Sequence, residues 1–94
     1  MSSKYLNYPK GFIVKKYYSN GQLAIFFHNY DSEPIAELSV NDDTIELASD
    51  EIILKDYSEN SNIAQQFLVS NILIPTDRFA LIGSHLCPIC RVAV

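Results

Sequence analysis

Glycine is scarce in this chain, and long apolar runs are missing. The 94 residues include only three glycines, Gly11, Gly21 and Gly83, so there is no glycine-rich loop of the kind that cradles phosphate groups. No apolar run approaches the length of about 18 residues that marks a membrane-spanning helix. Residues 1–10 also lack the apolar segment of a signal peptide. We therefore expect a cytoplasmic protein that does not associate with a membrane.

Cysteine and histidine are equally scarce, with two of each. Cys87-Pro88-Ile89-Cys90 has the spacing of a metal knuckle or a redox pair, but a structural zinc ion takes four ligands and would need both His85 and the distant His28. A redox pair needs a helix N-terminus that lowers the pKa of its first thiol, whereas the residues that follow resemble a strand. Against these two alternatives, we expect two reduced thiols that pack as small apolar groups, with no metal and no cofactor.

Two other groups of residues could suggest catalysis. Asp42 and Asp43 with Glu46 resemble a carboxylate pair or a cation site, but aspartates in turns usually bond their own backbone. Tyr57-Ser58-Glu59 offers a hydroxyl, but no histidine is near in the sequence, and a helix start accounts for Ser58. We therefore expect a protein that is not an enzyme.

Charge is distributed unevenly along the chain. Residues 1–30 contain four lysines and no acid, whereas residues 31–59 contain ten acids and one lysine. An acidic middle third repels a phosphate backbone, which argues against direct nucleic-acid binding. These acids form either a solvated sheet face or a surface that meets a basic partner. The acids that we assign to a candidate binding surface are Glu37, Asp42, Asp43, Glu46, Asp50 and Glu51.

The sharpest structural signal is Asn20-Gly21, between two β-rich runs that extend from Phe12 to Asn29. This dipeptide favours a two-residue type I′ turn, which would place Tyr18 opposite Leu23 and Val14 opposite Phe27. Both faces of this hairpin are substantially apolar. One face must cover the core, and the second needs a terminal strand, a second copy of the chain in a homodimer, or a partner. The second face comprises Ile13, Tyr17, Ala24 and Phe26.

The remaining pattern predicts one α+β domain over residues 1–94, with residues 1–10 as an extended lead-in. We expect a mostly antiparallel sheet of five to seven strands, with hairpin and meander connections and a single helix packed on one face. The helix should span residues 61–70, where Ile63, Ala64, Phe67 and Leu68 form an apolar stripe. Asn60 or Asn62 would cap it, and Asn71 would end it in a left-handed conformation. Further strands are expected at residues 35–40, 44–48, 51–55, 79–82 and 91–94.

Five short segments share a pattern with known proteins: residues 20–25, 55–60, 75–78, Gly83 and 88–91. Through these segments, the sequence from Asn20 to the C-terminus resembles a family of short proteins of unknown function carried by bacterial plasmids, phages and other mobile elements. The resemblance implies a mobile-element setting and no particular reaction. Asn71 and Asp77 stand where relatives carry glycine, a change that keeps the turn geometry, and Cys87 stands where they tend to carry alanine.

Two functions of different classes fit these observations. The first is stoichiometric binding of a host protein with a basic surface, such as a CRISPR or restriction nuclease, through the acidic residues above. Such a protein would be a phage or mobile-element inhibitor of host defence. The alternative is a small-molecule or nucleotide binder with an aromatic pocket. The residues of that pocket would be Tyr17, Tyr18, Phe26, Tyr30 and Tyr57.

Overall fold

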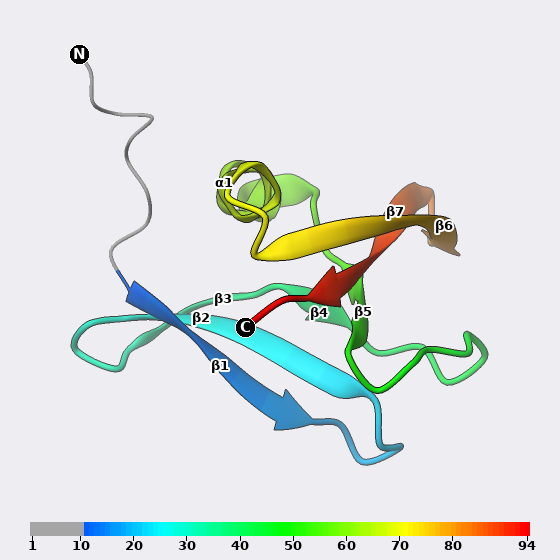
Figure 1. The fold of residues 1–94 in the computed structure, drawn as a ribbon, viewed down its shortest axis with the longest axis horizontal. Helices are drawn as coiled ribbons and strands as arrows, with labels where there is room; N and C mark the ends of the chain where they lie inside the picture. Colours follow the sequence, from blue (N-terminus) through cyan, green and yellow to red (C-terminus); the bar gives the residue numbers. More distant parts are fainter. Residues whose placement is uncertain (1–10) are drawn as a thin grey trace.

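Two antiparallel sheets and one helix make up the part of the chain that this computed structural model describes, residues 11–94. The predicted α+β class with a single α-helix is confirmed, and the seven strands lie within the predicted range of five to seven, but they form two sheets where one was predicted. The sheets have the strand orders β1-β2-β3 and β4-β5-β7-β6 (Figure 1). The lead-in predicted for residues 1–10 lies outside the described residues. The elements are β1 (Gly11–Tyr17), β2 (Leu23–Asn29), β3 (Pro34–Glu37), β4 (Ser39–Val40), β5 (Glu51–Leu54), a 3-10 turn (Ser58–Asn60), α1 (Ser61–Val69), β6 (Leu73–Ile82) and β7 (His85–Val92).

The β1–β2 hairpin forms as predicted, but the predicted turn is wrong. The backbone N–H of Gly21 donates to the carbonyl of Tyr18 at 2.9 Å, and the N–H of Tyr18 donates to the carbonyl of Gln22 at 2.8 Å. Gly21 has a φ of 89°, whereas Asn20 is not in the positive-φ region that a type I′ turn needs at both positions. The loop therefore has three residues, a type I turn followed by a left-handed glycine.

The longer loop shifts the hairpin register by one residue. Ile13 lies opposite Phe27 and Tyr17 opposite Leu23, so the predicted pairs of Tyr18 with Leu23 and of Val14 with Phe27 are wrong. The predicted second face is wrong too, because Ile13 and Tyr17 share the side of Leu23 and Phe27. The opposite side carries Phe12, Val14, Lys16, Ala24, Phe26 and His28.

The two sheets are joined at Leu38, where the chain leaves one sheet and enters the other. The predicted strand at residues 35–40 is divided there, since β3 pairs with β2 and β4 pairs with β5. The N–H of Leu38 donates to the carbonyl of Ile25 in the first sheet, and its carbonyl accepts from the N–H of Lys55, each at 2.8 Å. Beyond this point the hydroxyl of the buried Ser39 accepts the N–H of Ile25 at 2.9 Å. A side chain thus replaces the ladder partner that β2 loses.

Apolar side chains form one cluster on each face of the second sheet. The larger cluster fills the space between the two sheets and the helix, and it includes Leu23, Ile25, Phe27, Ile52, Leu54, Phe67, Cys90 and Val92. The smaller cluster, on the other face, comprises Ile53, Ala80, Cys87 and Ile89, packed against Val40, Ile45, Leu47, Tyr57 and Ile82. All four residues of β5 are buried, as its run of three aliphatic residues predicts.

The helix α1 confirms the predicted span and apolar stripe, with Ala64 and Phe67 buried. Of the two predicted N-cap residues, Asn60 occupies the N-cap position and Asn62 lies within the helix. The side chain of Asn60 makes no capping bond, because its amide donates to the carbonyl of Glu37 at 2.6 Å. Asn71 ends the helix with a φ of 64°, as expected, and Asp77 has a φ of 72°. Among the described residues no helix is long and apolar enough to span a membrane.

Three predicted strands need correction. Residues 44–48 form a loop, although Ile45 and Leu47 point inward as expected, because side chains bind the loop backbone where a neighbouring strand would pair. The strands predicted at 79–82 and 91–94 are the ends of the much longer β6 and β7. Pro75 lies on the edge strand β6. Pro88 precedes Ile89, the first residue of β7 that pairs with β5. Neither proline therefore interrupts a hydrogen-bonded ladder.

Replacing Ser39 with alanine should lower the free energy of unfolding by about 1–3 kcal/mol, because the buried N–H of Ile25 would lose its acceptor. Urea unfolding followed by circular dichroism measures the change. Ser49→Ala, at an exposed position, is the matched control and should change stability by less than about 0.5 kcal/mol. Equal stabilities of the two variants would contradict the role assigned to this hydroxyl.

Candidate functional site

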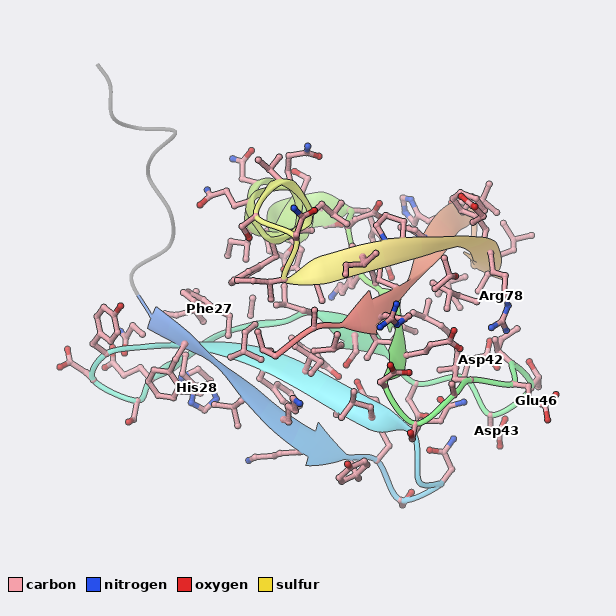
Figure 2. The ribbon with its side chains drawn as sticks, in the orientation of Figure 1. Phe27, His28, Asp42, Asp43, Glu46 and Arg78 are labelled. Atoms are coloured by element: carbon pink, nitrogen blue, oxygen red, sulfur yellow. The ribbon has the colours of Figure 1, made fainter. Side chains whose placement is uncertain are left out.

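The segment between β4 and β5, residues 41–50, carries most of the acids predicted to form a binding surface. We call it the acidic loop. Asp42, Asp43 and Glu46 lie together at one end of the molecule, close to Arg78 of β6 (Figure 2). Ile45 and Leu47 pack on the smaller apolar cluster, so the loop is attached to the sheet from within while its carboxylates are on the outer side.

Gln22, at the end of the first hairpin turn, binds the acidic loop through three hydrogen bonds. Its amide nitrogen donates to the carbonyls of Asp42 and Ile45, both at 2.9 Å, and its amide oxygen accepts the N–H of Asp42 at 3.2 Å. A single side chain therefore satisfies three backbone groups of the loop. In the observed register Gln22 pairs with Tyr18, whose N–H donates to its carbonyl.

Arg78 clamps the other side of the acidic loop. Its guanidinium donates to the carbonyl of Glu46 at 2.6 Å and to the carboxylate of Glu51 at 3.0 Å. The carboxylate of Glu51 also accepts the N–H of Ala48 at 2.9 Å, and the residue is buried. Glu51 is therefore an internal partner of Arg78 and is not part of an open acidic surface, which corrects its predicted role.

The other predicted acids differ in how far they are already bound. Asp43 and Glu46 are exposed, and their carboxylates have no partner among residues 11–94. The carboxylate of Asp42 accepts the hydroxyl of Thr44 at 2.6 Å and its N–H at 3.0 Å, which lowers the pKa of Asp42. Asp50 pairs with Arg91 at 3.4 Å across exposed surface. Within the acidic loop, the carboxylates of Asp42, Asp43 and Glu46 thus have no cationic partner among the residues that the structure describes.

Glu37 lies apart from the loop, on β3, where its carboxylate accepts the hydroxyl of Tyr18 at 2.5 Å. The same hydroxyl lies 2.8 Å from the hydroxyl of Ser39. Burial and then the bond to Glu37 raise the pKa of Tyr18 to about 12, so this phenol stays protonated. Glu37 itself is exposed, and this bond connects its carboxylate to the junction between the two sheets, apart from the acidic loop.

The five aromatic residues of the alternative pocket do not meet. Tyr17 and Tyr30 are exposed at separate places, and Phe26 lies beneath the ammonium of Lys16, 5.8 Å from its ring centre. Tyr57 stacks on His85 with ring centroids 4.0 Å apart. A cavity of about 360 Å³ lies elsewhere, between β1, the end of α1 and the C-terminal residue. It is lined by Gly11, Phe12, Ile13, Lys15, Phe67, Ile72 and Val94, and by none of these five aromatics.

Cys87 and Cys90 lie on β7 and face opposite sides of the sheet. Side chains three residues apart on a strand point in opposite directions, and the two thiols accordingly belong to different apolar clusters. They cannot share one metal ion or close a disulfide with each other. Within residues 11–94 no three potential metal ligands come together.

Sequence reasoning missed the residues that hold the acidic loop. Gln22 follows the turn dipeptide and looks like an ordinary polar flank, and Arg78 is separated from Glu46 by more than thirty positions. The predicted strand at residues 79–82 did contain a signal for an exposed apolar surface. Alternation along a strand places Phe79 and Leu81 on the same face, and both are exposed in the structure.

At pH 8, the rate at which iodoacetamide alkylates Cys90 should be more than about tenfold lower in the folded protein than in the guanidinium-unfolded chain. Burial and then the charge of Asp56 raise its pKa from 9.0 to about 11, which suppresses the thiolate. The stabilisation from this neutral thiol is complete below pH 9 and is lost as the pH rises through 11. Mass spectrometry of quenched samples gives both rates, and equal rates would contradict this environment.

Comparison of the chain with protein-family models, curated proteins and solved structures found no match. The resemblance to a mobile-element family therefore stays a prediction.

Proposed function

We propose that the chain acts by stoichiometric binding of a protein with a basic surface, and that the acidic loop is the contact. One observation carries this proposal: Gln22 and Arg78 hold the loop backbone from two sides, while three of its carboxylates pair with no cation within residues 11–94. Turnover plays no part in this function.

The two clamps matter because ordering a loop on binding costs free energy. A loop that is already held loses less conformational freedom when a partner docks, so more of the contact energy appears as affinity. The unpaired carboxylates also attract a basic surface over a distance of about 10 Å at moderate salt. Arg78 and Arg91 are occupied by Glu51 and Asp50, and they do not reduce the charge of Asp43 or Glu46.

The kind of partner follows from this chemistry. A basic surface that an acidic loop can occupy is typical of a nucleic-acid channel, such as that of a CRISPR or restriction nuclease. The predicted mobile-element setting makes inhibition of a host defence nuclease the natural role. Two free cysteines that are both buried favour a reducing compartment, so we place this activity in the cytoplasm.

The cavity next to β1 supports a second candidate function, small-molecule binding. Of its seven described lining residues, five have apolar side chains and Lys15 alone has a charged one, so the cavity fits an apolar molecule with one anionic group. The aromatic residues of the sequence-based alternative take no part in this cavity.

Reversing the charge of the acidic loop should slow association with the partner. A tagged protein captures partners from a bacterial lysate, and mass spectrometry identifies those that Asp43→Lys/Glu46→Lys fails to retain. Surface plasmon resonance on the identified protein should then show an association rate at least about tenfold lower for this variant, with a weaker dependence on salt. Asp31→Lys/Glu59→Lys makes the same change in net charge at other exposed acids and is the matched control. Equal rates for both double variants would contradict the proposal.

Gln22→Ala should loosen the acidic loop without changing its charge. The N–H of Asp42 loses its acceptor, so its hydrogen exchange should speed up by at least about tenfold, as measured by NMR. Dissociation from the captured partner should become faster, while the initial electrostatic attraction is kept. Gln65→Ala, on the exposed side of α1, is the control. Unchanged exchange at Asp42 would show that the clamp does not order the loop.

A further inference from the structure

The β6–β7 hairpin exposes an apolar patch made of Phe79, Leu81 and Leu86. Their exposed fractions are 56%, 67% and 63%. Leu81 lies directly opposite Leu86 and Phe79 opposite Pro88, so these side chains share one face of the hairpin. This face is the continuation of the one that carries the buried Cys90 and Val92. The apolar face of β7 therefore extends beyond the core that it covers.

The patch borders a free sheet edge, because β6 is the last strand of its sheet. Gly83 has a φ of 60° and Ser84 is not in the positive-φ region, the pattern of a two-residue type II′ loop between Ile82 and His85. The residues that flank such a loop exchange hydrogen bonds, and the bonded positions then alternate along the ladder. Phe79 and Leu81 are therefore the residues whose N–H and C=O groups point away from β7.

The second half of the β6 edge, residues 79–82, lacks the features that protect the first half from pairing with another strand. Pro75 and the irregular pairing between Pro75 and Arg78 interrupt the first half, and both features discourage strand addition. Beyond this point the only charged residue is Arg78, and its guanidinium is turned to Glu51 and Glu46 on the opposite face. Residues 79–82 thus present an uninterrupted apolar edge.

We propose that two copies of the chain pair antiparallel through their β6 edges, about a two-fold axis at Ala80. This register sets Phe79 of each copy opposite Leu81 of the other, with the outward N–H and C=O groups of both residues facing each other as a hydrogen-bonded pair. The edge is self-complementary, since the same two apolar residues meet twice and no charge is buried. The hairpin carries one acid, Asp77, and two arginines, Arg78 and Arg91, in a chain with a net charge of −4, so electrostatic repulsion between two copies is weak at this edge.

The size of the contact sets its strength. Three exposed side chains and one short strand bury less than the roughly 800 Å² per partner of a standard interface, so the dimer should be reversible and concentration-dependent. Salt should strengthen it, because salt screens the repulsion between two acidic chains. Binding of a basic partner through the acidic loop should weaken with salt instead. The two proposals can therefore fail independently, and salt dependence distinguishes them.

Sedimentation equilibrium from about 5 to 500 µM tests the proposal. The wild-type weight-average mass should rise from 10.6 kDa toward twice that value. Leu81→Lys should weaken association by at least about tenfold, and Leu81→Pro should do the same by removing an outward N–H while the ladder to β7 stays intact. Val69→Lys, at an exposed apolar position on α1, is the control and should dimerise like the wild type. Circular dichroism shows that each variant is folded, and Phe79→Lys replaces any variant that is not.

Disulfide formation tests the register. The two paired Cα atoms are about 5.5 Å apart in such a pair, within reach of a disulfide. A mixture of Phe79→Cys and Leu81→Cys should therefore give a cross-linked dimer under mild oxidation, whereas each variant alone should not. A wild-type chain that stays monomeric over the whole range, equal association of Leu81→Lys and Val69→Lys, or cross-linking of Phe79→Cys with itself would overturn the proposal. In the first case the edge would be left to a strand of another protein.

Discussion

The transfer of the chain from one sheet to the other at Leu38 is the constraint on which the rest of this structure depends. The backbone of Leu38 bonds to both sheets. The hydroxyl of the next residue, Ser39, accepts the N–H of Ile25 on β2, where β3 no longer supplies a backbone partner. Because the strand turns here, the two sheets can face each other and enclose the larger apolar cluster. Tyr18 and Glu37 bond at the same point, so the first hairpin is attached to the junction by polar contacts as well as by burial.

The same constraint explains why the acidic loop exists as an ordered loop. After β4 the chain must return to form β5, and the intervening residues cover the second face of the sheet with Ile45 and Leu47. Their backbone groups have no neighbouring strand, and Gln22 and Arg78 bind them instead. Apolar anchoring inside and side-chain clamps at both ends leave the carboxylates of Asp43 and Glu46 to the solvent. The exposure of these acids thus follows from the way in which the loop covers the sheet.

The acidic loop and the β6 edge are linked through Arg78. By turning its guanidinium to Glu51 and Glu46, it holds the loop and at the same time leaves the neighbouring edge without a protecting charge. In the dimer that we propose, each copy would carry its own acidic loop beside the paired edges. Two such loops on one assembly would bind a partner with two basic sites by raising the effective concentration of the second contact.

The sequence by itself determined the elements whose signals are local: the first hairpin, the amphipathic helix, the doubly buried β5 and the left-handed Asn71. It also located the acids, since their concentration in residues 31–59 needs no structure to be seen. Only the tertiary structure decided the register at Asn20-Gly21, because the bonds of Tyr18 and Gln22 to distant segments favour the three-residue loop. It also decided which acids are free, because the partner of Glu51 is 27 positions away in the sequence. Local patterns report backbone preference and burial, whereas pairing across the fold depends on where the chain crosses between sheets.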